Sequence, residues 1–122
     1  RRYLGRGKPG DVRNTWATLN DVIEWISAAG GQAVLAHPAK YKLSNLRLEE
    51  LAREFAAAGG HGLEVLCGRQ DMALTRRLSK LATRHDLLAS CGSDFHAPGP
   101  YRPELGSVEA LPPECRPVWA LW

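Results

Sequence analysis

The sequence has few of the features that define several protein classes. Only three of its 122 residues are cysteines, and none of them form the C-x-x-C pair of a zinc knuckle or redox motif. They are odd in number and widely spaced, at positions 67, 91 and 115. A reducing compartment fits this pattern best, so we expect a cytoplasmic protein.

Long apolar runs are also absent. No stretch approaches the roughly 18 consecutive apolar residues that a membrane helix requires. The opening RRYLGRGKPG has positive charges but no apolar region after them, so it resembles neither a signal peptide nor an anchor. We therefore expect no membrane association.

Charge of either sign is modest. Lysine and arginine total 16 against 13 acidic residues, for a net charge of +3. This balance does not indicate a dedicated binder of duplex DNA, whereas small phosphorylated molecules would suit a mildly basic surface. With 44% hydrophobic residues, the chain can form one ordinary globular core.

Three segments carry helical patterns. Apolar residues recur every three or four positions over 18–31, 44–60 and 71–86. Capping residues stand at or near the start of each segment, and paired glycines end the first two. A short apolar run follows each helix, namely QAVLAHP, GLEVLC and LLASCGS. Runs that are apolar on both faces suit strands of a parallel sheet buried between layers.

The predicted fold class is therefore α/β, with the order α-β-α-β-α-β and right-handed crossovers between three parallel strands. We divide the chain into a basic lead-in over 1–17, this core over 18–96 and a proline-rich tail over 97–122. The final VWALW is expected to pack back on the core as an aromatic closure.

Polar residues stand at the predicted carboxyl ends of two strands. His37 ends the first strand, and Asp94 and His96 follow the third. Parallel strands bring these ends to one edge, where α/β proteins build their active sites. Imidazole nitrogen and carboxylate oxygen together suit zinc, manganese or iron(II). The pattern alone leaves a metal site and a merely structural arrangement equally open.

Other side chains could support or extend this site. Glu64 interrupts the second apolar run, where it either orients a ligand from behind or lies at the rim. Lys40 and Tyr41 follow His37 closely, and Arg69 follows the second strand. Each of these three could meet a phosphate or simply be solvated.

We expect no catalytic or metal-binding role for the remaining histidines or for two of the cysteines. His61 lies in a glycine-rich turn and His85 at a helix end, so both are expected at the surface. Cys67 and Cys91 are expected to act as small buried apolar residues rather than nucleophiles.

Three motifs resemble the later motifs of the PHP (polymerase and histidinol phosphatase) phosphoesterases. They are AVLAHPAKYKLS, GLEVLC and LLASCGSDFHAPGP. The resemblance also includes RYLGRGKP and VWALW, and it is strongest to bacterial nucleoside 3′,5′-bisphosphate phosphatases that also act as 5′-to-3′ exoribonucleases. The family's early metal-binding motifs, beginning with H-x-H, have no counterpart here. The sequence thus resembles the C-terminal portion of such an enzyme.

The resemblance implies a distorted (β/α)₇ barrel, of which this chain would form the C-terminal part. It implies divalent ions as cofactors, with Mn²⁺ first and Zn²⁺, Fe²⁺ or Mg²⁺ as alternatives. By matching motifs, His37, Asp94 and His96 are implied metal ligands, with Asp94 and His37 also assigned to catalysis. Glu64 matches a recurrent family glutamate and is not carried over as a ligand.

The implied substrates are nucleoside 3′,5′-bisphosphates and the 5′ ends of short RNA. Lys8, Lys40 and Tyr41 are candidate phosphate contacts. The other implied partner is the missing N-terminal part of the same protein, and this chain alone is expected to be inactive. Three alternatives stay open: a histidinol-phosphate type of phosphatase, a polymerase-associated proofreading nuclease, and a non-catalytic binding module.

Overall fold

Helices and strands alternate along the chain in the predicted order. The computed structural model describes residues 7–9, 11 and 15–122. Its elements are α1 (Leu19–Ala28), β1 (Val34–Leu35), the 3₁₀ helix η1 (Pro38–Tyr41), α2 (Asn45–Ala57), β2 (Gly62–Cys67), α3 (Met72–Arg84), β3 (Leu88–Gly92) and the 3₁₀ helix η2 (Val118–Leu121). The three predicted helices and three predicted strands are all present.

Each α-helix begins at a side-chain cap that the sequence indicates. The Thr18 hydroxyl and the Asp21 carboxylate form a reciprocal capping box at the start of α1. The Ser44 side chain caps α2, and the Asp71 carboxylate accepts two backbone N–H groups at the start of α3. Past the end of α2, Gly59 takes the left-handed conformation that a helix C-terminus favours.

The sheet has three parallel strands in the order β1-β2-β3. Val34 pairs with Gly62 at one side of β2, and Gly62 pairs with Leu88 at the other. β1 has only two residues, because the backbone leaves the strand before His37 and turns into η1. The sheet therefore confirms the parallel α/β prediction but shortens the first strand.

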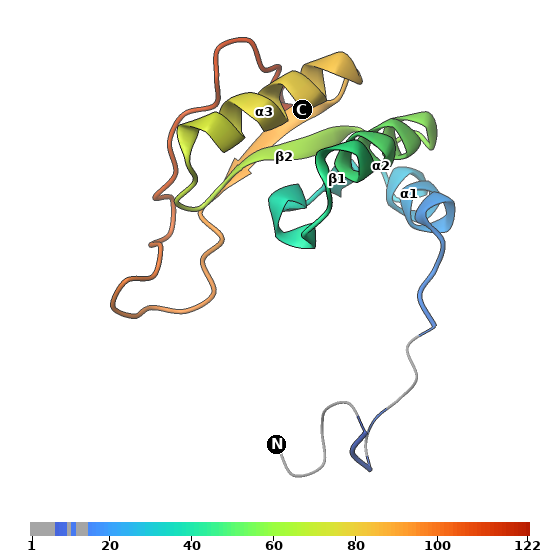
Figure 1. The fold of residues 1–122 in the computed structure, drawn as a ribbon. Helices are drawn as coiled ribbons and strands as arrows, with labels where there is room; N and C mark the ends of the chain where they lie inside the picture. The colour runs from blue at the N-terminus through green and yellow to red at the C-terminus, as the bar shows by residue number, and fades with distance from the viewer. Residues whose placement is uncertain (1–6, 10, 12–14) are drawn as a thin grey trace.

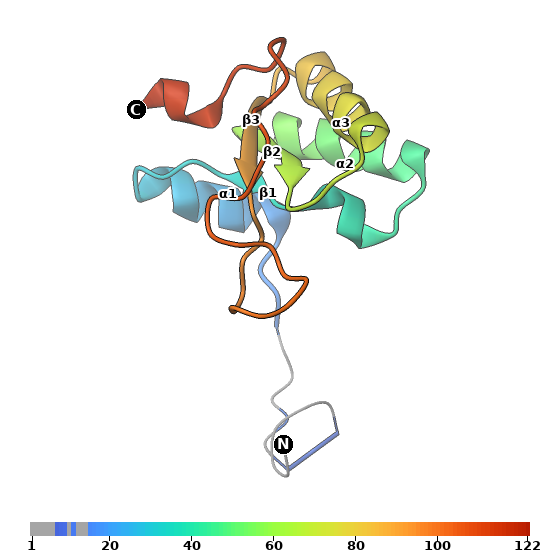
Figure 2. The same ribbon diagram turned by 90° about the vertical axis from the view of Figure 1, so that its left-hand side faces the viewer.

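The core lies between β2 and the helices α2 and α3, which occupy the same side of the sheet in both views (Figures 1 and 2). On β2, Leu63 and Val65 are fully buried. They pack in one cluster with side chains of the two helices, among them Leu48, Ala52, Phe55, Leu78 and Leu81. Because alternate strand residues point to opposite faces, Glu64 is directed away from this cluster.

The tail returns to β3, but not through its aromatic side chains. Pro117 bridges to Ala89 of β3, and Val118 at the start of η2 is buried. Trp119 and Trp122 are 43% and 87% exposed, so the prediction of an aromatic closure is wrong. The compact Val118 side chain makes the contact instead.

The apolar stripe predicted for α1 is only partly covered. Ile23 is buried, whereas Leu19 and Val22 are more than one-third exposed and Trp25 is 63% exposed.

Among the described helices, none combines the length and apolar character needed to cross a membrane.

Candidate active site

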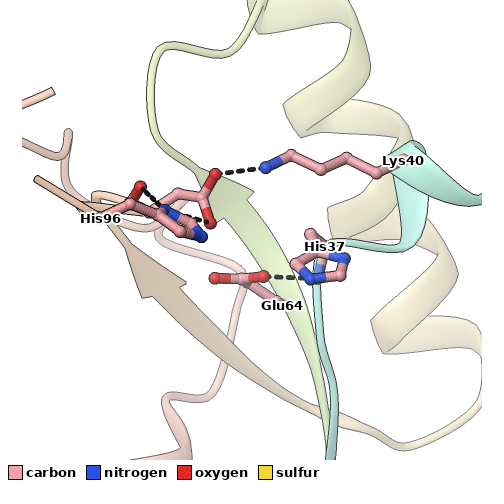
Figure 3. A network of polar contacts seen from close by, with 5 residues as sticks. His37, Lys40, Glu64 and His96 are labelled. Atoms are coloured by element: carbon pink, nitrogen blue, oxygen red, sulfur yellow. Dashed lines mark hydrogen bonds and ion pairs between the residues drawn. The ribbon is translucent and has the colours of Figure 1, made fainter. Parts of the chain in front are cut away.

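The carboxyl ends of the three strands bring together most of the predicted site residues (Figure 3). His37 leaves β1, Glu64 lies within β2, and Asp94 and His96 follow β3. Lys40 reaches this edge from η1. The parallel topology thus joins residues up to 59 positions apart in sequence, from His37 to His96.

His37 is held in an unusual backbone conformation by two neighbours, Glu64 and Tyr41. Its φ of 30° and ψ of 55° are left-handed, which costs a non-glycine residue free energy. Its backbone N–H donates to the Glu64 carboxylate. The Tyr41 ring stands edge-on to the imidazole with centroids 5.9 Å apart, and the Tyr41 hydroxyl donates to the Ala36 carbonyl at 2.7 Å. Tyr41, predicted to contact phosphate, therefore supports the His37 turn.

The His37 imidazole keeps one nitrogen without a partner. Nδ1 is buried and has no hydrogen-bond partner in the described structure. Buried polar atoms are nearly always satisfied in native proteins, so an unpaired imidazole nitrogen calls for a specific explanation. An imidazole nitrogen with a free lone pair is a donor that divalent transition metals accept.

Asp94 is ion-paired with Lys40, and the two groups reinforce each other's charge. The hydrogen bond from Lys40 holds the pKa of Asp94 below its usual value. The same contact raises the pKa of Lys40. Both groups are therefore charged at neutral pH, and the Lys40 ammonium lies against the Asp94 carboxylate.

Asp94 and His96 lie close together for a reason that the sequence pattern does not give. An extended D-x-H segment would direct both side chains to one face, but Asp94 has a left-handed φ of 56°. The His96 ring Nδ1 instead hydrogen-bonds the Asp94 backbone carbonyl at 2.8 Å and lies 3.9 Å from its Oδ1. The proximity is confirmed, whereas the extended geometry is wrong.

Glu64 connects two of the strand ends. Its side chain is half-buried, accepts from the His37 backbone, and runs over Gly92 of β3. A Cβ at position 92 would lie 3.3 Å from Glu64 Oε1, tighter than ordinary contact. The glycine therefore leaves room for the carboxylate, which supports the site through the backbone of His37.

A cavity of about 220 Å³ opens beside this edge. Its lining includes His37, Lys40, Cys67 and Arg69. Burial raises the pKa of the Cys67 thiol, and the nearby Glu64 carboxylate adds to this shift. Cys67 is thus a neutral residue of the cavity wall, which agrees with the prediction that it is not a nucleophile.

Some predicted residues are not assembled here. Lys8 does not line the cavity at the strand edge, so its role as a phosphate contact stays a prediction. Within residues 7–9, 11 and 15–122, no three His, Cys, Asp or Glu side chains converge closely enough to hold a metal ion. His37, Asp94 and His96 therefore share an edge without forming a closed ligand cage.

The two other histidines are more involved in the structure than expected. His61 is half-buried, and its Nδ1 accepts the Ala33 backbone N–H at 3.1 Å. The His85 side chain is 14% exposed and contacts Glu49 of α2 at 2.8 Å. Both lie away from the candidate site and join neighbouring elements.

Curated relatives match the whole chain. It is 48% identical over 119 residues to a 3′,5′-nucleoside bisphosphate phosphatase from Chromobacterium violaceum and 43% identical over 122 residues to the 5′-3′ exoribonuclease Rnm from Escherichia coli. These alignments cover 98% and 100% of this chain but 42% and 41% of the relatives. The chain thus spans about two fifths of their length. No family model matches it.

Solved structures share the fold. A Chromobacterium violaceum protein described as an amidohydrolase, with bound sulfate and no metal, is 47% identical and superposes with a TM-score of 0.81 over 98% of this chain and 41% of its own. A Bifidobacterium adolescentis protein described as a metal-dependent phosphoesterase is 26% identical, with a TM-score of 0.63 over 96% of this chain and 39% of its own.

The sequence and structural matches agree along nearly the full chain, and they confirm the resemblance inferred from the motifs. The chain is homologous to the C-terminal part of proteins named as a nucleoside bisphosphate phosphatase and as 5′-3′ exoribonucleases.

Proposed function

We propose that this chain supplies part of the active site of a metal-dependent phosphoesterase. The substrates would be nucleoside 3′,5′-bisphosphates and the 5′ ends of short RNA. The observation that carries the proposal is the buried, unpartnered Nδ1 of His37 at the strand edge that also presents Asp94 and His96. The names of the relatives supply the substrate class.

The side chains at this edge are of the types that bind a divalent ion, but the described part of the chain has too few of them to hold one. His37, Asp94 and His96 offer imidazole nitrogen and carboxylate oxygen, which suit divalent transition metals. The resemblance to the PHP phosphoesterases puts Mn²⁺ first, with Zn²⁺, Fe²⁺ and Mg²⁺ as alternatives. The missing ligands would come from the part of the relatives that this chain does not span. When bound, such ions polarise a phosphoryl oxygen and make a water molecule more acidic.

The chain's own residues prepare this edge for a phosphate. Asp94 holds negative charge at neutral pH and would orient the protons of an attacking water. Lys40 is 53% exposed and lines the cavity, so it is the cation that we propose to contact a phosphate oxygen. Glu64 and Tyr41 fix the backbone on both sides of His37, so that its imidazole keeps one orientation.

The test is Mn²⁺-dependent phosphate release from adenosine 3′,5′-bisphosphate by the protein expressed from its complete reading frame. Asp94→Asn should lower kcat/KM by more than about 100-fold, because even residues behind metal ligands cost about 10–100-fold. Asp86→Asn is the matched control: Asp86 is an exposed aspartate with the same left-handed backbone, located before β3 rather than after it.

The control should retain wild-type activity and metal affinity. Folded, Mn²⁺-loaded wild type that releases no phosphate would overturn the bisphosphatase assignment and favour another phosphate monoester or a binding role. Equal losses in both variants would remove Asp94 from the site.

A further inference from the structure

The outer face of α3 is strongly one-sided in charge. Its 13 residues include four cations, Arg76, Arg77, Lys80 and Arg84, and no acidic residue. The chain as a whole is nearly balanced, at 16 basic against 13 acidic residues. This helix therefore concentrates more positive charge than the whole chain's net +3.

Three of these cations line a groove between α3 and α2. The groove has a volume of about 220 Å³, and Asn45 and Glu49 of α2 form its other wall. Arg77, Lys80 and Arg84 are spaced three and four residues apart, which places them along one helix face. The distance from Arg77 to Arg84 along the axis is about 10 Å at 1.5 Å per residue.

The groove is organised by contacts that leave two cations available. Arg77 donates to the Asn45 side-chain oxygen at 2.7 Å, a neutral partner that fixes the guanidinium without cancelling its charge. Arg84 pairs with Glu49 at 2.7 Å, so those two charges balance. Lys80 forms no ion pair within the described part of the chain, although Glu114 of the tail lies near it and Arg76.

One end of the groove lies toward the candidate site. Asn45 is the first residue of α2, four residues after the end of η1, which carries Lys40. The Arg77 contact with Asn45 therefore marks the end nearer the strand edge, and Arg84 marks the far end. A chain that leaves the edge would meet Arg77 first, then Lys80.

We propose that the groove between α2 and α3 binds the phosphate backbone of single-stranded RNA downstream of the nucleotide held at the strand edge. This inference rests on the proposed function. Its span of about 10 Å corresponds to about three phosphates at 3.4 Å per nucleotide of stacked strand. Contacts to phosphate alone would give binding without sequence preference.

The experiment compares Arg77→Gln/Lys80→Gln with Arg47→Gln/Arg53→Gln in the protein from the complete reading frame. Both double variants remove two cations, but Arg47 and Arg53 lie on α2 outside the groove lining. Fluorescence anisotropy would measure the Kd for a 12-nucleotide unstructured RNA across a salt series. Hydrolysis of adenosine 3′,5′-bisphosphate would be measured in parallel.

The groove variant should bind RNA about 10- to 30-fold more weakly at 0.1 M salt, with the slope of log Kd against log salt reduced by about 1.4. Its kcat/KM for the mononucleotide should stay within twofold of wild type. The control variant should keep the wild-type RNA affinity and slope.

Unchanged RNA binding in the groove variant would overturn the proposal. The same loss in both double variants would overturn it too, because it would reflect net charge alone. Equal weakening toward a polyglutamate of the same length would also overturn it, since the groove would then be a general polyanion surface. If the wild type fails to hydrolyse the mononucleotide, the proposed function is contradicted. The RNA-binding proposal is judged separately, because RNA binding is measured in its own experiment.

Discussion

The helix-covered face of the sheet and its carboxyl-terminal edge are held together in different ways. On the covered face, Leu63, Val65 and Leu78 are at most 1% exposed and pack without directional contacts. At the edge, His37 and Asp94 have left-handed backbones held by hydrogen bonds and an ion pair.

This difference suggests that the covered face stabilises the fold, whereas the edge holds the strained residues of the candidate site. A left-handed non-glycine residue costs on the order of 1–3 kcal/mol and persists only where its surroundings enforce it. The packed face supplies that excess stability through burial of apolar area. We therefore expect substitutions in the face to unfold the protein, and substitutions at the edge to alter local geometry.

Leu78→Ala should have the largest effect and would test the role of the face. Removing this fully buried side chain should lower the free energy of unfolding by about 3 kcal/mol, because the cavity left behind cannot fully collapse. Leu46→Ala, at a 78% exposed position of α2, should stay within about 0.5 kcal/mol of wild type. Urea unfolding followed by far-ultraviolet circular dichroism measures both. A cost below about 1 kcal/mol for Leu78→Ala would contradict the comparison.

Glu64→Ala should have a smaller and more local effect. It leaves the His37 N–H without its acceptor, and the loss of a hydrogen bond to a charged group costs about 1.5 kcal/mol. Amide resonances of His37 and of residues 39–41 should shift in a ¹⁵N–¹H spectrum, while those of α2 and α3 stay in place. Glu54→Ala, at an exposed site on α2, is the control and should change neither property. Shifts spread through the core would mean that Glu64 stabilises the helix-covered face of the sheet and not only the edge.

The same division explains what the sequence could predict. Helix starts depend on local chemistry, and the caps Thr18, Ser44 and Asp71 lie at the start of the three segments where the sequence offers capping residues. The parallel order of strands followed from their apolar composition and helical connections. These features require no knowledge of distant contacts.

The edge could be predicted only in outline, because its geometry depends on distant partners. The Lys40–Asp94 pair joins residues 54 positions apart, and no local pattern specifies it. The left-handed turn at His37, which shortens β1, relies on Glu64 from the neighbouring strand. In the tail, Val118 is buried whereas Trp119 and Trp122 are not, and aromatic content alone does not indicate which of these side chains meets the core.

Glu49→Gln should have the smallest effect, and it separates electrostatics from packing within the helical layer. Arg84, with His85, holds the pKa of Glu49 below its usual value. Between that lowered pKa and the ordinary value of the unfolded chain, the unfolded state binds more protons, so the pair's contribution is full above about pH 4.5 and is lost as pH falls. The wild type should exceed the variant by about 0.5 kcal/mol at pH 7, as for exposed ion pairs, and the difference should decrease as the pH falls to 3. A difference that persists at pH 3, measured by urea unfolding at both pH values, would mean that the Glu49 side chain acts through packing. The layer joining α2 to α3 would then be held by the same non-directional contacts as the face beneath it.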